Sequence, residues 1–256
     1  MTNVHLISNA RSGSSYLFCV LKHYINPSQP RFIMNDDSFD EPFNPTVIRT
    51  HHSDRTYTEC CQLRIINIKN TNSLVVKNHI NHLDQVQSVS QDLLDRFLDI
   101  EMYNIALVRR DLFQYVLSLC IADVTNDWIE YNYHHPFEID PVQFCVRFDY
   151  QMNNLMKLIN NVHGIKYNEI VCYEDLEGNA RIDYSRLDMC YTHISMLQPT
   201  NVDEVKRSPS KTDLVLNYNQ LFDLCLTLID NYIINNDCSN IKIENGILVD
   251  FLAQSC

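Results

Sequence analysis

Residues 4–21 read VHLISNARSGSSYLFCVL, and the expected architecture follows from this stretch. Residues 4–8 form a short apolar segment typical of a buried strand, and residues 15–24 carry apolar side chains at helical spacing. Between them lies a polar turn that contains Gly13, one of only 4 glycines in the chain. Glycine lets a backbone turn tightly, and the N-terminus of the following helix presents N–H groups to an anion. The stretch therefore predicts a strand, an anion-binding loop and a helix.

The side chains of this turn also suit an anion. Arg11 supplies a fixed positive charge, and hydroxyl donors come from Ser12, Ser14 and Ser15. An ordinary strand–turn–helix with a serine N-cap would explain the same serines without any ligand. The sequence contains no Gly-x-x-x-x-Gly-Lys-Ser/Thr loop, so an ATPase or GTPase loses its main support.

Short apolar segments alternate with helical segments along the rest of the chain. Further strands are expected near residues 74–76, 103–108 and 170–173. Helices are expected near residues 56–68, 83–98, 111–122, 142–162 and 214–234. This alternation predicts an α/β fold with three layers, in which helices flank a central parallel sheet.

The chain reads as a single domain that covers residues 1–256, with irregular segments at about 26–55 and 126–140. Long irregular segments in compact domains are often functional, so we expect these two to shape the side of the site that binds an acceptor. Ligands of parallel sheets bind beyond the carboxyl ends of the strands. Three segments fall there: residues 9–16, 77–79 and 109–111.

The overall composition narrows the class of partner. The net charge of −12 disfavours a general binder of nucleic acid or of anionic membranes. No apolar run approaches the ~18–20 residues that span a bilayer, and the first residues lack the pattern of a signal peptide. We therefore expect a cytoplasmic protein.

The cysteines and histidines do not suggest a metal. None of the 10 cysteines forms a Cys-x-x-Cys pair, so reduced thiols are expected rather than a disulfide or metal framework. The pairs His51-His52 and His134-His135 have no further ligands at useful spacing. We expect no metal site.

Residues 9–17, NARSGSSYL, resemble the 5′-phosphosulfate loop of sulfotransferases that use 3′-phosphoadenosine 5′-phosphosulfate (PAPS). Cytosolic members carry Lys-Ser-Gly-Thr-Thr-Trp, and Golgi carbohydrate sulfotransferases carry Arg-Ser-Gly-Ser-Ser, which this chain matches at residues 11–15. The resemblance implies that Arg11 contacts the phosphosulfate bridge and that Tyr16 replaces an aromatic side chain near the adenine. It also implies a group of residues that cradle the 5′ phosphate: Ser12, Gly13, Ser14 and Ser15.

A second anchor has the spacing of the family's 3′-phosphate site. That site is a strand ending in Arg, with a Ser eight residues later on the next helix, and Arg110 and Ser118 have this spacing. A guanidinium binds a phosphate through paired N–H groups, which a hydroxyl can supplement. Arg109 could instead pair with a carboxylate. Surface charges at a strand end are the alternative explanation for both arginines.

Lys77-Asn78-His79 is similar to the Lys-Thr-His of cytosolic sulfotransferases. There the histidine is the general base and the lysine helps to hold the donor. An imidazole with an ordinary pKa of ~6.5 suits the removal of a proton near neutral pH. Lys77 would stabilise charge on the bridging oxygen. His82 and a carboxylate remain alternative bases, because carbohydrate-type members often use Glu or Asp.

Two downstream segments also follow the family's order. Tyr173-Glu174-Asp175-Leu176 resembles the Tyr-Glu-Asp-Leu at the end of a family strand, which implies that Tyr173 lies close to the adenine. The basic segment with Lys206 and Arg207 stands where many members close a loop over the 3′ phosphate. The Arg-Lys-Gly version of that loop is absent.

The resemblance implies a transferase that moves a sulfuryl group from PAPS to a hydroxyl or amine of a small-molecule or carbohydrate acceptor. The attack would be in line, the nucleotide product would be 3′-phosphoadenosine 5′-phosphate (PAP), and no metal would be needed. Catalytic roles would fall on His79, Lys77 and Arg11. A nucleotide-dependent small-molecule kinase of related fold and a non-catalytic nucleotide-binding protein are the alternatives.

Overall fold

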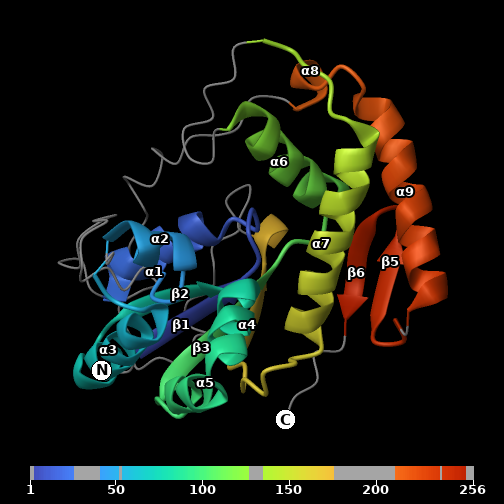
Figure 1. Cartoon of the computed structure of the whole chain (residues 1–256). Helices are drawn as coiled ribbons and strands as arrows, with labels where there is room; N and C mark the ends of the chain where they lie inside the picture. Colours follow the sequence, from blue (N-terminus) through green and yellow to red (C-terminus); the bar gives the residue numbers. More distant parts are fainter. Residues whose placement is uncertain are drawn as a thin grey trace. The chain divides into compact units, whose positions relative to one another are not determined.

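Figure 1 shows the computed structural model of the chain, which describes residues 3–25, 41–51, 54–126, 135–175, 211–236 and 238–251. The chain divides into two compact units. The first consists of Met1–Val108, Asn161–Gln198 and Ser255–Cys256, and the second of Arg109–Asn160 and Pro199–Gln254.

The first unit is built on a sheet of four parallel strands. They are β1 (Asn3–Ser8), β2 (Val75–His79), β3 (Met102–Val108) and β4 (Glu169–Cys172), in the order β2-β1-β3-β4. Ser8 lies opposite both His79 and Leu107, and Val108 lies opposite Cys172. The four strands therefore end at one edge of the sheet, where parallel sheets bind their ligands.

Helices cover both faces of this sheet. Successive residues of a strand point to opposite faces, and β1 shows the two sides clearly. Val4 and Leu6 belong to the apolar cluster with Phe18 of α1 (Ser14–Ile25). On the other face, the His5 ring meets Phe97 of α5 (Gln91–Leu98) edge to face, with 5.0 Å between ring centres. The predicted α/β fold with three layers is confirmed.

The remaining helices of the first unit begin where local signals place them. They are α2 (Pro45–His51), α3 (Tyr57–Asn70), α4 (Ile80–Val89) and the short 3-10 helix η1 (Tyr173–Asp175). α3 starts with a capping box, in which Thr56 and Glu59 bond each other's backbone N–H. The expected single helix over residues 83–98 is wrong: α4 and α5 meet at Ser90, whose hydroxyl accepts a hydrogen bond from Leu93 N (3.3 Å) and starts a new helix.

The second unit combines helices with a hairpin. Its elements are α6 (Leu112–Thr125), α7 (Pro141–Ile159), α8 (Lys211–Leu214), α9 (Tyr218–Asn235), and the antiparallel strands β5 (Ile241–Glu244) and β6 (Ile247–Phe251). Phe113 is central to its core, because its ring meets those of Phe144, Tyr218 and Phe222. The helix predicted over residues 214–234 begins later, at Tyr218, and the hairpin was not predicted.

Across the part of the chain that the structure describes, no helix combines the length and the apolar character needed to cross a membrane.

Candidate functional site

The loop between β1 and α1 has a backbone that requires glycine at one position. Arg11 and Gly13 both have positive φ, 65° and 81°. A Cβ atom on Gly13 would lie 2.0 Å from Cδ2 of Tyr173, whose ring covers this part of the loop. Loops with left-handed residues just before a helix commonly form concave anion sites. The predicted turn between a strand and a helix is thus present, and Tyr173 lies against it.

The serines of the loop do different things. Ser12 is 1% exposed, and its hydroxyl donates to the Asn9 carbonyl oxygen (2.7 Å). Ser14 is buried at the first residue of α1, whereas Ser15 is exposed and its Oγ receives a hydrogen bond from Lys77 Nζ (3.4 Å). Ser12 therefore shapes the loop, and Ser15 connects it to β2. Tyr16 lies in the first turn of α1.

Lys77 and His79 project from β2 on the same face as α1. The Lys77 ammonium lies 5.7 Å from the centre of the Phe18 ring of α1 and forms an ion pair of 2.6 Å with Oε1 of Glu41. The same Oε1 is 3.7 Å from Nε2 of His79, whose Nδ1 lies 3.1 Å from the Ser8 hydroxyl. The structure thus brings together two residues that the sequence predicted, Lys77 and His79, and one that it did not, Glu41.

Burial and charge set the protonation of this group, which we call the Glu41–Lys77–His79 cluster. Burial lowers the pKa of His79 to about 3, against a raising effect of Glu41. For Glu41, burial favours the neutral acid, but Lys77 and the neighbouring histidines outweigh it and hold the pKa at about 2. Burial likewise lowers the pKa of His82 to about 4. Near pH 7 Glu41 is therefore a carboxylate, and the imidazoles of His79 and His82 are neutral.

Ser8, His79 and Glu41 follow one another like a serine–histidine–carboxylate triad. A nucleophilic serine needs a hydroxyl that a substrate can reach. Ser8 is 0% exposed, inside a strand that is buried along its whole length. His79 has 14% of its side chain exposed and Glu41 has 20%. The reachable groups are therefore a proton acceptor and a carboxylate, which suits acid–base chemistry.

The opposite face of the sheet carries a second polar group, the His5–Asn78–Asn104 chain. His5 is 0% exposed; its Nδ1 lies 3.2 Å from the Asn104 amide oxygen, and its Nε2 lies 3.1 Å from the Asn78 amide nitrogen. An amide nitrogen can only donate, so Nε2 accepts and Nδ1 carries the proton. Burial lowers the pKa of His5 to about 3. This histidine is neutral and internally bonded.

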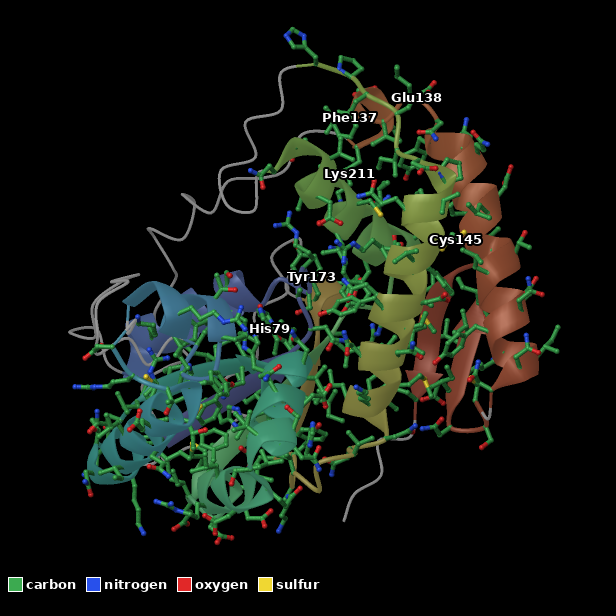
Figure 2. The ribbon with its side chains drawn as sticks, viewed as in Figure 1. His79, Phe137, Glu138, Cys145, Tyr173 and Lys211 are labelled. Carbon is green, nitrogen blue, oxygen red and sulfur yellow. The ribbon has the colours of Figure 1, made fainter. Side chains whose placement is uncertain are left out.

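The predicted 3′-phosphate residues belong to the second unit. Arg110 precedes α6, and its carbonyl oxygen accepts a hydrogen bond from Leu248 N of β6 (2.9 Å). Ser118 lies in α6 and is 6% exposed. Arg109 begins this unit. Lys206 and Arg207 lie outside the described residues. Figure 2 labels His79 and Tyr173 in the first unit and Lys211 in the second. The Nζ of Lys211 donates a hydrogen bond to the Gln114 carbonyl oxygen (3.2 Å).

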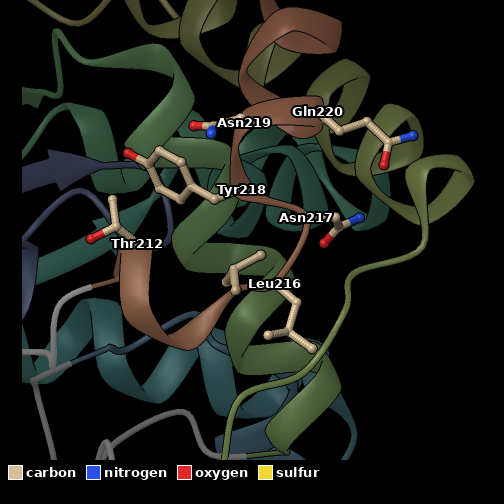
Figure 3. A pocket seen from close by; sticks show the side chains of 7 residues that line it. Thr212, Leu216, Asn217, Tyr218, Asn219 and Gln220 are labelled. Atoms are coloured by element: carbon tan, nitrogen blue, oxygen red, sulfur yellow. The ribbon is translucent and has the colours of Figure 1, made fainter.

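The second unit also has a hollow of about 450 Å³ at the start of α9 (Figure 3). The Asn217 side chain bonds both N and O of Ile139, and the Tyr218 hydroxyl accepts from Gln114 Nε2 (2.6 Å). These lining groups hold the unit together. The hollow is therefore a weaker candidate for chemistry than the Glu41–Lys77–His79 cluster.

Sequence reasoning missed Glu41 because nothing local identifies it. It lies in the segment expected to be irregular, 36 positions before Lys77 in the chain. The only signal was Lys77 itself, because it follows the apolar residues Val75 and Val76, and a lysine that a sheet buries requires a carboxylate partner. Lys77 is 3% exposed.

A comparison with protein-family models found no match to this chain, and a search of curated proteins found no match either. The fold and the site define an α/β protein in which a glycine-containing loop joins β1 to α1 beside a cluster of lysine, histidine and glutamate.

Proposed function

We propose that this protein is a sulfotransferase that moves a sulfuryl group from PAPS to a hydroxyl or amine of a small-molecule or carbohydrate acceptor. The observation that carries the proposal is the position of Lys77. Its ammonium reaches Ser15 at the N-terminus of α1 (3.4 Å) and stands two residues before His79 on the same strand. One cation thus adjoins both an anion-binding helix end and a proton acceptor.

Sulfuryl transfer needs an anion-binding helix end and a proton acceptor close together. The acceptor oxygen or nitrogen forms a bond to sulfur while the bond from sulfur to the bridging phosphate oxygen breaks, and PAP leaves. The acceptor's proton must pass to a base, and the charge on the leaving oxygen must be stabilised. We assign the proton to Nε2 of His79 and the charge to Lys77, with Arg11 at the loop.

His79 is favoured over the alternative bases by its surroundings. His82 is 5% exposed, and its Nδ1 accepts a hydrogen bond from the His79 backbone N–H (3.4 Å), so it supports β2 where it meets α4. Glu41 is the carboxylate alternative, but its ion pair with Lys77 makes it a weak proton acceptor. A neutral imidazole beside it is the stronger base.

Calorimetry with PAP, AMP and ATP tests the donor. We expect PAP to bind at least about tenfold more tightly than AMP, because a second phosphate adds charge-assisted hydrogen bonds. ATP should not bind more tightly than PAP. Equal affinities for PAP and AMP would contradict the assignment of a 3′-phosphate site, and tight binding of ATP with magnesium would favour a kinase.

Lys77→Met should weaken PAP binding by about tenfold, which corresponds to the loss of one charged contact. Since this change leaves the Glu41 carboxylate without its cation, the double variant Lys77→Met/Glu41→Gln is measured as well. Lys69→Met, at an exposed position in the last turn of α3, is the matched control. Unchanged PAP affinity in both Lys77 variants would rule out this lysine as a donor ligand.

A further inference from the structure

The backbone beside Glu41 is held in place by side chains of α3. Arg64 of α3 donates from Nη1 to the Pro42 carbonyl oxygen (2.7 Å). Tyr57 of the same helix donates from its hydroxyl to the Phe43 carbonyl oxygen (2.9 Å). Phe43 itself is 0% exposed. The two residues that follow Glu41 thus have a defined position, so Glu41 is a built part of the site.

Lys77 and His79 compete for one oxygen of the Glu41 carboxylate. Asn44 Nδ2 donates a hydrogen bond to the other oxygen, Oε2 (2.5 Å), which leaves Oε1 for Lys77 and His79. Oε1 is 2.6 Å from Lys77 Nζ and 3.7 Å from His79 Nε2. The first distance is that of a short ion pair, and the second is beyond a hydrogen bond. A shift of about one ångström would reverse this preference.

We propose that Glu41 is a positioning residue that Lys77 holds away from His79 until an anion binds at the 11–15 loop. When an anion takes a share of the Lys77 ammonium, Glu41 becomes available to pair with the imidazolium that forms when Nε2 of His79 takes up a proton. The imidazole then becomes a base of ordinary strength only when the donor is present. The proposal rests on the proposed function, since it makes donor binding the event that activates the base.

The charges around His79 support this coupling. The groups that face the imidazole among the described residues are Ser8 of β1, Lys77 of its own strand, His82 of α4 and Glu41. Burial and Lys77 lower the pKa of His79, and Glu41 raises it. A bound anion therefore acts twice: it offsets the effect of Lys77, and it releases the carboxylate that favours the protonated imidazole.

Titration of the His79 imidazole by NMR in the full chain tests the proposal, with His79→Asn used to assign the signal. The free protein should show no titration of His79 between about pH 5 and pH 8, and the protein saturated with PAP should show a midpoint inside this interval. In Glu41→Gln the midpoint should stay outside the interval although PAP still binds. Glu101→Gln, an exposed carboxylate before β3, is the matched control and should behave as the wild type.

The outcomes separate the two proposals when inorganic phosphate is used as a second anion. If PAP binds and the wild-type midpoint does not move, or moves as far in Glu41→Gln, the role of Glu41 is wrong and the sulfotransferase proposal stands. If phosphate binds and moves the midpoint but PAP does not bind, the coupling stands and the donor is wrong. If neither anion binds, both fail. A wild-type midpoint that does not move on PAP binding refutes the role of Glu41 even where Glu41→Gln does not fold.

Discussion

The two faces of the parallel sheet use histidine in opposite ways. On one face, His5 is 0% exposed and bonds Asn78 and Asn104 with both ring nitrogens. On the other face, His79 is partly exposed and has a carboxylate and an ammonium within reach. Both imidazoles have a pKa lowered to about 3 by burial. A low pKa alone therefore does not distinguish a structural histidine from a functional one.

The two histidines differ in how many of their ring nitrogens have a hydrogen-bond partner. Both nitrogens of His5 have partners that fix its tautomer, so nothing is left for a ligand. At His79 one nitrogen lies 3.1 Å from the Ser8 hydroxyl, and the other faces the Glu41 carboxylate at 3.7 Å without a hydrogen bond. A face that stabilises the fold and a face that carries the proposed site thus share one strand pair, β1 and β2.

Phe97→Ala should have the largest effect and should be confined to the His5 face. Phe97 is 0% exposed, and its ring meets those of His5 and Phe43. Truncation of a buried Phe leaves a cavity that costs about 3–5 kcal/mol of unfolding free energy, measured here by urea denaturation. Leu63→Ala, at a position 42% exposed on α3, is the control with a much smaller loss.

The same variant tests how independent the two faces are. Below its midpoint of denaturation, Phe97→Ala should bind PAP or phosphate with an affinity within about threefold of the wild type, since additivity holds for separated sites. A loss of anion affinity far beyond threefold would mean that the Phe43 side chain transmits the change to Glu41. The two faces of the sheet would then not be independent.

His5→Gln should reduce the pH dependence of stability. The folded-state pKa of His5 is about 3, below the unfolded value, so its contribution is complete above ~pH 6.5 and is lost as the pH falls from there toward 3. In that range one buried neutral histidine adds a slope of about 1.4 kcal/mol per pH unit. Urea denaturation from about pH 6.5 down to pH 5 should show His5→Gln with a slope lower by that amount.

His135→Gln, at an exposed position, should leave the slope of the wild type and serves as the matched control. If His5→Gln keeps the full slope, His5 is protonated in the folded protein, and its bond from Asn78 has been assigned in the wrong direction. The two faces would then not differ in the way that the hydrogen bonds indicate.

Sequence patterns predicted the strands that build the sheet because each is short, apolar and followed by a turn. The patterns failed for elements whose ends are set by one or two residues. Ser90 ends one helix and caps the next within a continuous helical pattern. The β5–β6 hairpin turns on Asn245 and Gly246, with φ of 51° and 80°. Asn-Gly between β-branched residues is a strong hairpin signal, so this element was predictable.

The site was predictable only where its residues follow one another in the chain. Gly13 lies in a local pattern, and so do Lys77 and His79. Glu41 meets them only through the tertiary fold, because Arg64 and Tyr57 of α3 hold its segment beside β2. No spacing in the sequence encodes that meeting. The placement of an isolated carboxylate depends on packing, which a linear pattern does not contain.

Ser8→Ala should have the smallest effect of these variants. It tests which ring nitrogen of His79 carries the proton, and so how His79 differs from His5. Loss of this buried hydroxyl, 0% exposed, should lower the unfolding free energy by about 1 kcal/mol. A hydrogen bond to the Ser8 backbone raises the pKa of His79, which is the effect of a ring N–H donor. The wild type should therefore show the Nδ1–H form by ¹⁵N NMR, and Ser8→Ala, which removes only the hydroxyl and keeps the backbone acceptor, should keep this form.

Ser88→Ala, an exposed serine of α4 that bonds Gln85 O, is the matched control and should leave the tautomer unchanged. If the wild type already carries its proton on Nε2, the Ser8 hydroxyl donates to Nδ1, and His79 points a donor at Glu41. The proton acceptor on this face would then be the carboxylate, and His79 would resemble His5 in having both nitrogens engaged. The tautomer of one ring thus decides whether the two faces differ in kind or only in exposure.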